Sequence, residues 1–209
     1  MIFNKFSSVF AKTGQEILYA QQYEEVALNA LSNLHELHEL LNNYTGAIFD
    51  NGLFKIHNKG SFYIWTKLAF EYFKKFQGNS YCFAFDWLGR QYAVNYFNNK
   101  TMILILDPAT AEAFEVDKNI ESFLNEDLAE NKDFLFDVEK FYHLQKLVSQ
   151  FRFEECFGFK QFLFLGGEDV VENYEITNME VYWELNHQIY LKTRNLPPGT
   201  KVNLSIDPI

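Results

Sequence analysis

The residues best suited to chemistry in this sequence are two histidines, two cysteines and several dense groups of carboxylates. His35 and His38 lie three positions apart, whereas a catalytic zinc helix carries its two histidines four positions apart. Leu34 and Leu37 form the neighbouring apolar stripe, which leaves both imidazoles on the solvated edge of a helix. We therefore predict no metal at this pair.

The cysteines, Cys82 and Cys156, are too few for a disulfide framework or a zinc site, and they indicate buried thiols in a reducing compartment. A catalytic pair of Cys156 with His143 is conceivable because the two are near in sequence. Nothing around Cys156 would lower the pKa of its thiol, so a buried structural role is favoured.

Other catalytic signatures are missing from the sequence, which contains no G-x-S-x-G, no Walker-type glycine loop and no G-x-G-x-x-G. The string Gly166-Gly167-Glu168-Asp169 is only superficially similar to the signature of nucleotide cyclases, because the acid order differs and no aromatic follows. A tight turn with solvated acids is favoured. We predict a protein that is not an enzyme and that carries no cofactor and no metal.

The negative charge is unevenly distributed. The 209 residues carry a net charge of −10, of which residues 1–100 hold +1 and residues 101–209 hold −11. Such a surface repels nucleic acids and anionic membranes, and it speeds encounter with a basic protein. The alternative is that the acids only keep the protein soluble. If the acids do contact a partner, the best candidates are those where carboxylates are dense and bases scarce: Glu126, Asp127, Glu130, Glu168, Asp169 and Glu172.

Composition indicates a folded, soluble chain. Hydrophobic residues make up 48% and aromatic residues 18%, so we expect Trp87 and Trp183 to be buried in one shared core. The longest apolar run, Met102–Leu106, is far shorter than the roughly 20 residues that span a bilayer, and the first residues lack a secretory apolar segment. The expected location is the cytoplasm.

Hydrophobic periodicity predicts five helices and a β-meander. The helices cover 15–43, a segment capped by Ser61 and ended by Gly78, two acidic segments near 119–130 and 134–149, and 179–193. A capping box of Thr177 and Glu180 opens the last helix, with Val181, Leu185 and Ile189 facing inward. Strands are expected over 53–57, 81–86, 91–97, 102–106 and 113–116, with a last short strand after Pro197-Pro198-Gly199.

The predicted fold class is therefore α+β: N-terminal helices, a curved and mainly antiparallel sheet of about four to six strands, and C-terminal helices packed on one core. We expect residues 1–209 to form a single domain, of which residues 1–49 are a helical N-terminal segment. The sequence shows no linker, low-complexity tract or internal repeat.

Three blocks of sequence carry a resemblance to a known family. They are Phe83–Ala93 (FAFDWLGRQYA), Leu106–Val116 (LDPATAEAFEV), and the stretch from Glu155 to Trp183 that contains FLFLGGED. In this order they resemble the C-terminal domain of type VI secretion DNase-immunity proteins, among the SUKH-like immunity proteins. The resemblance covers residues 50–193. Ala111 stands where the family usually carries Gly, and Gln161 stands where a Pro often precedes the Leu-Phe-Leu-Gly-Gly run.

The resemblance implies a mixed α+β fold on a curved sheet. It also implies a bacterial cytoplasmic antitoxin that binds and occludes a secreted nuclease without catalysis of its own. The charge distribution agrees, since a nuclease must present a basic cleft to phosphates. The alternative function is a non-catalytic interaction scaffold, or an orphan immunity protein of the same fold.

Overall fold

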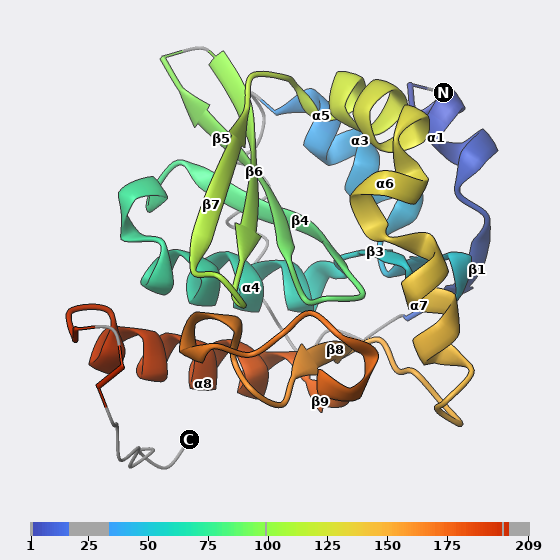
Figure 1. Cartoon of the computed structure of the whole chain (residues 1–209). Coiled ribbons are helices and arrows are strands. Elements are labelled where there is room, and N and C mark those ends of the chain that lie inside the picture. Colours follow the sequence, from blue (N-terminus) through green and yellow to red (C-terminus); the bar gives the residue numbers. More distant parts are fainter. Residues whose placement is uncertain (1, 17–33, 99, 198, 201–209) are drawn as a thin grey trace.

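A seven-stranded antiparallel sheet organises the chain (Figure 1). The computed structural model describes residues 2–16, 34–98, 100–197 and 199–200. The strands lie side by side in sequence order: β1 (Lys12–Gln15), β2 (Ala47–Phe49), β3 (Phe54–Ile56), β4 (Ser80–Asp86), β5 (Gln91–Phe97), β6 (Lys100–Asp107) and β7 (Glu112–Val116). A separate antiparallel pair follows, β8 (Glu155–Phe159) and β9 (Tyr174–Asn178).

Helices cover both faces of the large sheet (Figure 1). One face packs against α1 (Asn4–Val9), α3 (His35–Tyr44), α5 (Ile120–Ser122) with its π-helical continuation η3 (Phe123–Leu128), α6 (Lys132–Phe136) and α7 (Val138–Gln145). The other packs mainly against α4 (Lys59–Tyr72) and α8 (Met179–Thr193). Short 3₁₀ turns complete the chain: η1 (Asp50–Gly52), η2 (Lys74–Phe76), η4 (Leu163–Leu165) and η5 (Val171–Asn173). The α+β fold class is confirmed.

Each face of the sheet has its own apolar cluster. Along β6, Ile103 packs into the first cluster, whereas Leu104 and Leu106 pack into the second. Trp87 and Trp183 are both 0% exposed, as expected, but Trp87 lies in the first cluster and Trp183 in the second. The expectation of one shared core is therefore corrected. Near-continuous apolar strands are typical of a sheet buried on both faces.

The tight turn between β4 and β5 is built on the fully buried carboxylate of Asp86. Its Oδ1 accepts hydrogen bonds from the backbone N–H groups of Leu88 (3.0 Å) and Arg90 (3.1 Å). Its Oδ2 accepts from Arg90 Nε at 2.6 Å and from the Tyr92 hydroxyl at 3.0 Å. Arg90 also donates to the carbonyl oxygen of Leu135, so the turn is fastened to the end of α6.

The same turn contacts both helical layers. The Trp87 indole donates to the carbonyl of Phe136 in α6 at 2.6 Å, and the Trp183 indole of α8 donates to the carbonyl of Gly89 at 2.8 Å. The Phe157 N–H of β8 donates to the carbonyl of Trp87 at 2.8 Å. The turn therefore fixes α6, β8 and α8 relative to the sheet.

A buried lysine holds the segment before β8. Lys55 donates from Nζ to the carbonyl oxygens of Arg152 (2.9 Å), Phe153 (3.2 Å) and Glu155 (3.0 Å). The same Nζ lies 3.9 Å from the ring centroid of Phe151. Burial lowers the pKa of Lys55 to about 7, while nearby acids act in the opposite direction.

The sequence located the central strands well and the chain ends less well. The meander over β4–β7 and the closing helix at 179–193 are confirmed. Of the helix expected over 15–43, residues 17–33 lie outside the described part, Gln15 belongs to β1, and α3 accounts for the rest. The N-terminal segment is thus not only helical, and it adds β1 and β2 to the sheet. The strand expected after Gly199 lies outside the described residues.

Two helix starts differ from the sequence expectation by one to three residues. Asn58, not Ser61, caps α4 by accepting from the Ser61 N–H, and Ser61 Oγ accepts from the Asn58 N–H as the other half of a capping box. Asn178, not Thr177, caps α8 by accepting from the N–H groups of Glu180 and Val181. In both cases the asparagine directly before the first helical residue takes the role, since its short side chain reaches the free amides.

The inward face of α8 also differs from the expected stripe. Val181 and Leu185 are only partly buried, whereas Ile189 is buried as expected. The helix buries a stripe offset by one position, formed by Met179, Tyr182, Trp183, Asn186 and Ile189. No helix in the described part of the chain is long and apolar enough to cross a membrane.

Replacing Asp86 should strongly destabilise the fold. Asp86→Ala leaves the Arg90 guanidinium and the Tyr92 hydroxyl without their shared acceptor, and breaking a buried ion pair costs about 3–5 kcal/mol. Urea unfolding followed by far-UV circular dichroism measures the loss. Asp133→Ala on the exposed side of α6 is the matched control and should change stability by less than about 0.5 kcal/mol. Equal stability of the two variants would contradict the role assigned to Asp86.

His57 should remain neutral well below the pH at which an exposed imidazole charges. Its Nε2 contacts Gln91 Oε1 at 2.8 Å, and burial lowers its pKa to about 3 despite that hydrogen bond. Because the unfolded chain binds this proton near pH 6.5, its contribution to stability is complete above pH 6.5 and is lost as the pH falls toward 3. The loss is at most about 1.4 kcal/mol per pH unit. NMR titration of the ring measures this directly, and a midpoint near pH 6 would contradict it.

Candidate functional site

The six acidic residues predicted to contact a partner lie on two separate stretches of the surface. Glu126 and Asp127 belong to η3, and Glu130 follows it. Glu168 and Asp169 follow the Gly166-Gly167 turn, and Glu172 lies in η5. Five of the six are exposed and Asp127 is partly buried. Their role in binding stays a prediction.

Lysines of the same chain already engage four of these carboxylates. Lys118 Nζ lies 2.9 Å from a carboxylate oxygen of Glu126 and 3.0 Å from one of Asp127, and Lys5 lies 2.5 Å from Glu130. These pairs are in or near solvent, where such contacts contribute little to stability. They leave the acids accessible to a competing cation from a partner.

Lys140 links the start of α7 to the segment after the Gly166-Gly167 turn. Its Nζ lies 2.9 Å from Asp137 at the start of α7 and 2.8 Å from Asp169 beside the Gly-Gly turn. Asp169 also accepts from the Tyr174 hydroxyl at 2.7 Å. Partial burial would raise the pKa of Asp169, but hydrogen bonds from Lys140 and Tyr174 outweigh it and lower the pKa. The structure thus brings Asp137 and Asp169 to one lysine.

Phe134 is the surface residue that the sequence did not single out. Its side chain is 88% exposed, and it lies between the exposed acids Asp133 and Asp137. A helix continuous over 134–149 would place Phe134 one turn before Val138, on the buried face. Asp137 instead adopts a left-handed conformation (φ 45°), ends α6 and caps α7, and the break leaves Phe134 in solvent.

The other candidate chemical residues do not assemble into a site. His35 and His38 are exposed on α3, in agreement with their expected place on its solvated edge. Cys156 is fully buried whereas His143 is exposed, so they do not form a catalytic pair, and burial raises the pKa of the Cys156 thiol. The described residues hold no group of three or more His, Cys, Asp or Glu side chains placed to bind a metal ion.

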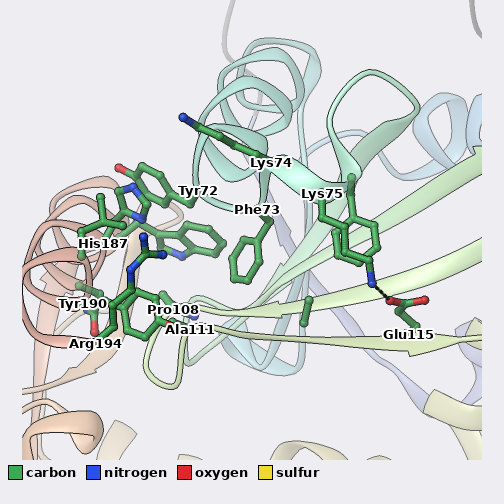
Figure 2. Close-up of a pocket in the computed structure, with 15 residues that line it drawn as sticks. Tyr72, Phe73, Lys74, Lys75, Pro108, Ala111, Glu115, His187, Tyr190 and Arg194 are labelled. Atoms are coloured by element: carbon green, nitrogen blue, oxygen red, sulfur yellow. Dashed lines mark hydrogen bonds and ion pairs between the residues drawn. The ribbon is translucent and has the colours of Figure 1, made fainter. Parts of the chain in front are cut away.

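A cavity of about 360 Å³ opens between η2, the β6–β7 turn and α8 (Figure 2). Aromatic rings form much of its wall. Tyr72 stacks on His187 with centroids 3.8 Å apart and planes 10° apart, and on Trp183 at 5.8 Å. Tyr190 and Pro108 lie close to this group, and a Lys75–Glu115 ion pair of 2.7 Å lies toward the opposite end of the cavity (Figure 2).

Comparison with known proteins finds that residues 117–190 are similar to one family. Residues 117–190 match the family model described as the C-terminal domain of the T6SS immunity protein Tdi1. This segment runs from the end of β7 into α8 and contains all six predicted contact residues and Phe134. No curated protein matches the sequence.

One similar solved structure is the crystal structure of Atu4351 from Agrobacterium tumefaciens. Its TM-score is 0.61 at 15% sequence identity, and the alignment covers 89% of this chain and 88% of that chain. At this identity the likeness shows a shared fold.

Ala111, in the β6–β7 turn beside the cavity, should be a strained position. It has a positive φ of 57°, which an L-residue with a Cβ adopts at a cost and glycine adopts freely. Ala111→Gly should therefore raise the unfolding free energy by about 0.5–1 kcal/mol, after the greater freedom of glycine in the unfolded chain is deducted. Urea unfolding measures it. Ala113→Gly, in the adjoining strand, should destabilise, and a loss of stability at both positions would contradict the strain.

Proposed function

We propose that this chain is a bacterial immunity protein of the type VI secretion kind. In this proposal it binds a nuclease effector in the cytoplasm and occludes the basic cleft of that effector, without catalysis of its own. The binding surface is the acidic region formed by residues 117–190, and the chain belongs with the DNase-immunity proteins of the SUKH-like group.

The distribution of charge supports this proposal best. Residues 117–190 contain 16 acidic and six basic residues, a net charge of −10, which equals the net charge of the whole chain. The remaining residues are balanced, with 12 of each sign. A nuclease presents Lys and Arg to the phosphates of its substrate, so a concentrated acidic surface is complementary to its cleft.

Phe134 gives this surface an apolar anchor. Tight interfaces usually depend on a few residues, often aromatic, that a polar rim shields from water. Phe134 is 88% exposed and has exposed acids on both sides. The acids would then set the rate and salt dependence of association, and the ring would set the lifetime of the complex.

The alternative is a non-catalytic interaction scaffold, or an orphan immunity protein, with the same fold and no cognate toxin. The two differ in genetic context, since a secreted nuclease gene beside this one favours immunity. They also differ in a protection assay, since only an immunity protein rescues cells that express the nuclease domain of that neighbour.

Charge reversal at the acidic surface should weaken protection without unfolding the protein. Glu126, Asp127 and Glu130 changed together to Lys, or Glu168, Asp169 and Glu172 changed likewise, should slow association with the nuclease about tenfold or more and weaken its salt dependence. Surface plasmon resonance at several salt concentrations, with cell survival, measures both effects. The melting temperature should stay nearly unchanged.

A matched variant separates local from global charge effects. Glu16, Glu71 and Glu112 are exposed and lie outside residues 117–190, and their change to Lys alters the net charge equally. This variant should bind almost as the parent does, whereas Phe134→Ala should speed dissociation by about 30-fold. If both acidic-surface variants protect cells like the parent, the electrostatic account is wrong.

A further inference from the structure

We propose that the cavity between η2, the β6–β7 turn and α8 binds a small planar anion. Its ligand is an aromatic ring that carries a hydrogen-bond donor and a phosphate or carboxylate group, as in a nucleoside monophosphate. This inference goes beyond the proposed function and does not depend on it, since none of the six predicted acidic contact residues lines the cavity.

The wall of the cavity suits a planar ring. Phe73 and Tyr190 line it together with the stacked pair of Tyr72 and His187, and the buried Trp183 ring supports Tyr72 from behind. Offset-stacked and edge-on contacts with such side chains favour a flat aromatic ligand over an aliphatic one. A volume of about 360 Å³ holds a compound of mononucleotide size and lies within the range of small-ligand pockets.

One end of the cavity is positive in an otherwise acidic protein. Arg194 lies beside His187 and Tyr190, with Lys74 further out (Figure 2). Neither Arg194 nor Lys74 forms an ion pair with another described residue. A guanidinium without a carboxylate partner is a ready site for a bidentate contact with an anion.

The nearest carboxylates are already engaged. Glu184 accepts hydrogen bonds from the Tyr72 hydroxyl and from Gln188 Nε2, and these two bonds lower the pKa of Glu184. Glu115 pairs with Lys75. The two cations also act on His187. Burial lowers the pKa of the His187 imidazole, Lys74 and Arg194 lower it further, and Glu184 acts in the opposite direction.

A buried acceptor in the cavity lining lacks a donor. Asn186 is 2% exposed, and its Nδ2 donates to the carbonyl of Tyr182 at 2.7 Å. Its Oδ1 has no hydrogen-bond partner among the described residues. A buried polar atom without a partner is costly, so a ligand N–H or O–H donor would satisfy this oxygen once the Asn186 side chain turns toward the cavity. The aromatic wall, the oxygen of Asn186 and the guanidinium of Arg194 thus correspond to the ring, the donor and the anionic group of the ligand.

Isothermal titration calorimetry of the full chain tests the proposal with adenosine 5′-monophosphate and with anthranilate, two aromatic anions that also carry an N–H donor. Saturable binding of either probe is expected, and the tighter one identifies the anionic group. Adenosine and inorganic phosphate, which each lack one feature, should bind about tenfold more weakly or worse. Absence of saturable binding of both aromatic anions at millimolar concentration would overturn the proposal.

Two arginine variants locate the binding. Arg194→Gln, at an exposed position, should weaken the binding of the better probe about tenfold, whereas Arg152→Gln, also exposed but remote from the cavity lining, should leave it unchanged. Asn186→Leu should weaken the binding of adenosine 5′-monophosphate more than the binding of inorganic phosphate. Equal effects of the two arginine variants, or phosphate binding as tight as that of the aromatic anions, would refute the assignment. Protection of cells from the nuclease should be unaffected by Arg194→Gln, which separates this test from that of the proposed function.

Discussion

The arrangement of the helices around the sheet depends on one buried carboxylate, that of Asp86. A carboxylate in the protein interior must be paired and hydrogen-bonded, and the four donors around Asp86 satisfy that requirement inside a single tight turn. The turn thereby becomes rigid, and its remaining groups bond to α6, β8 and α8. The two helical layers are therefore positioned through one short stretch of backbone.

The sequence predicted the parts of this fold that follow from local pattern. The strands of the meander alternate with turn residues, and α8 follows a run of polar capping residues, so both were found, although Asn178 and not Thr177 is the cap. The role of Lys55 could not be found in this way, because it lies in a strand and its three carbonyl acceptors lie about 100 residues away. Long-range contacts of this kind leave no periodic signal in the sequence.

The candidate surface, too, could be predicted from the sequence only in part. The dense carboxylates were visible by counting charges, and the structure adds that lysines already neutralise four of them. Phe134 was hidden because helical periodicity assumes an unbroken helix, and the left-handed Asp137 breaks it. A partner that binds here must displace intramolecular lysines, so part of the electrostatic attraction compensates for contacts that already exist.

The strand order of the large sheet has a consequence for how the protein is made. Every strand of this sheet after β1 pairs with the strand before it, so each pairing can form before any residue beyond the later strand is made. The apolar faces of the sheet are completed only later, by α5 to α7 on one side and α8 on the other. During synthesis, the newly paired sheet thus passes through a stage with exposed apolar surface, which lasts until residues 117–190 have emerged and closed it.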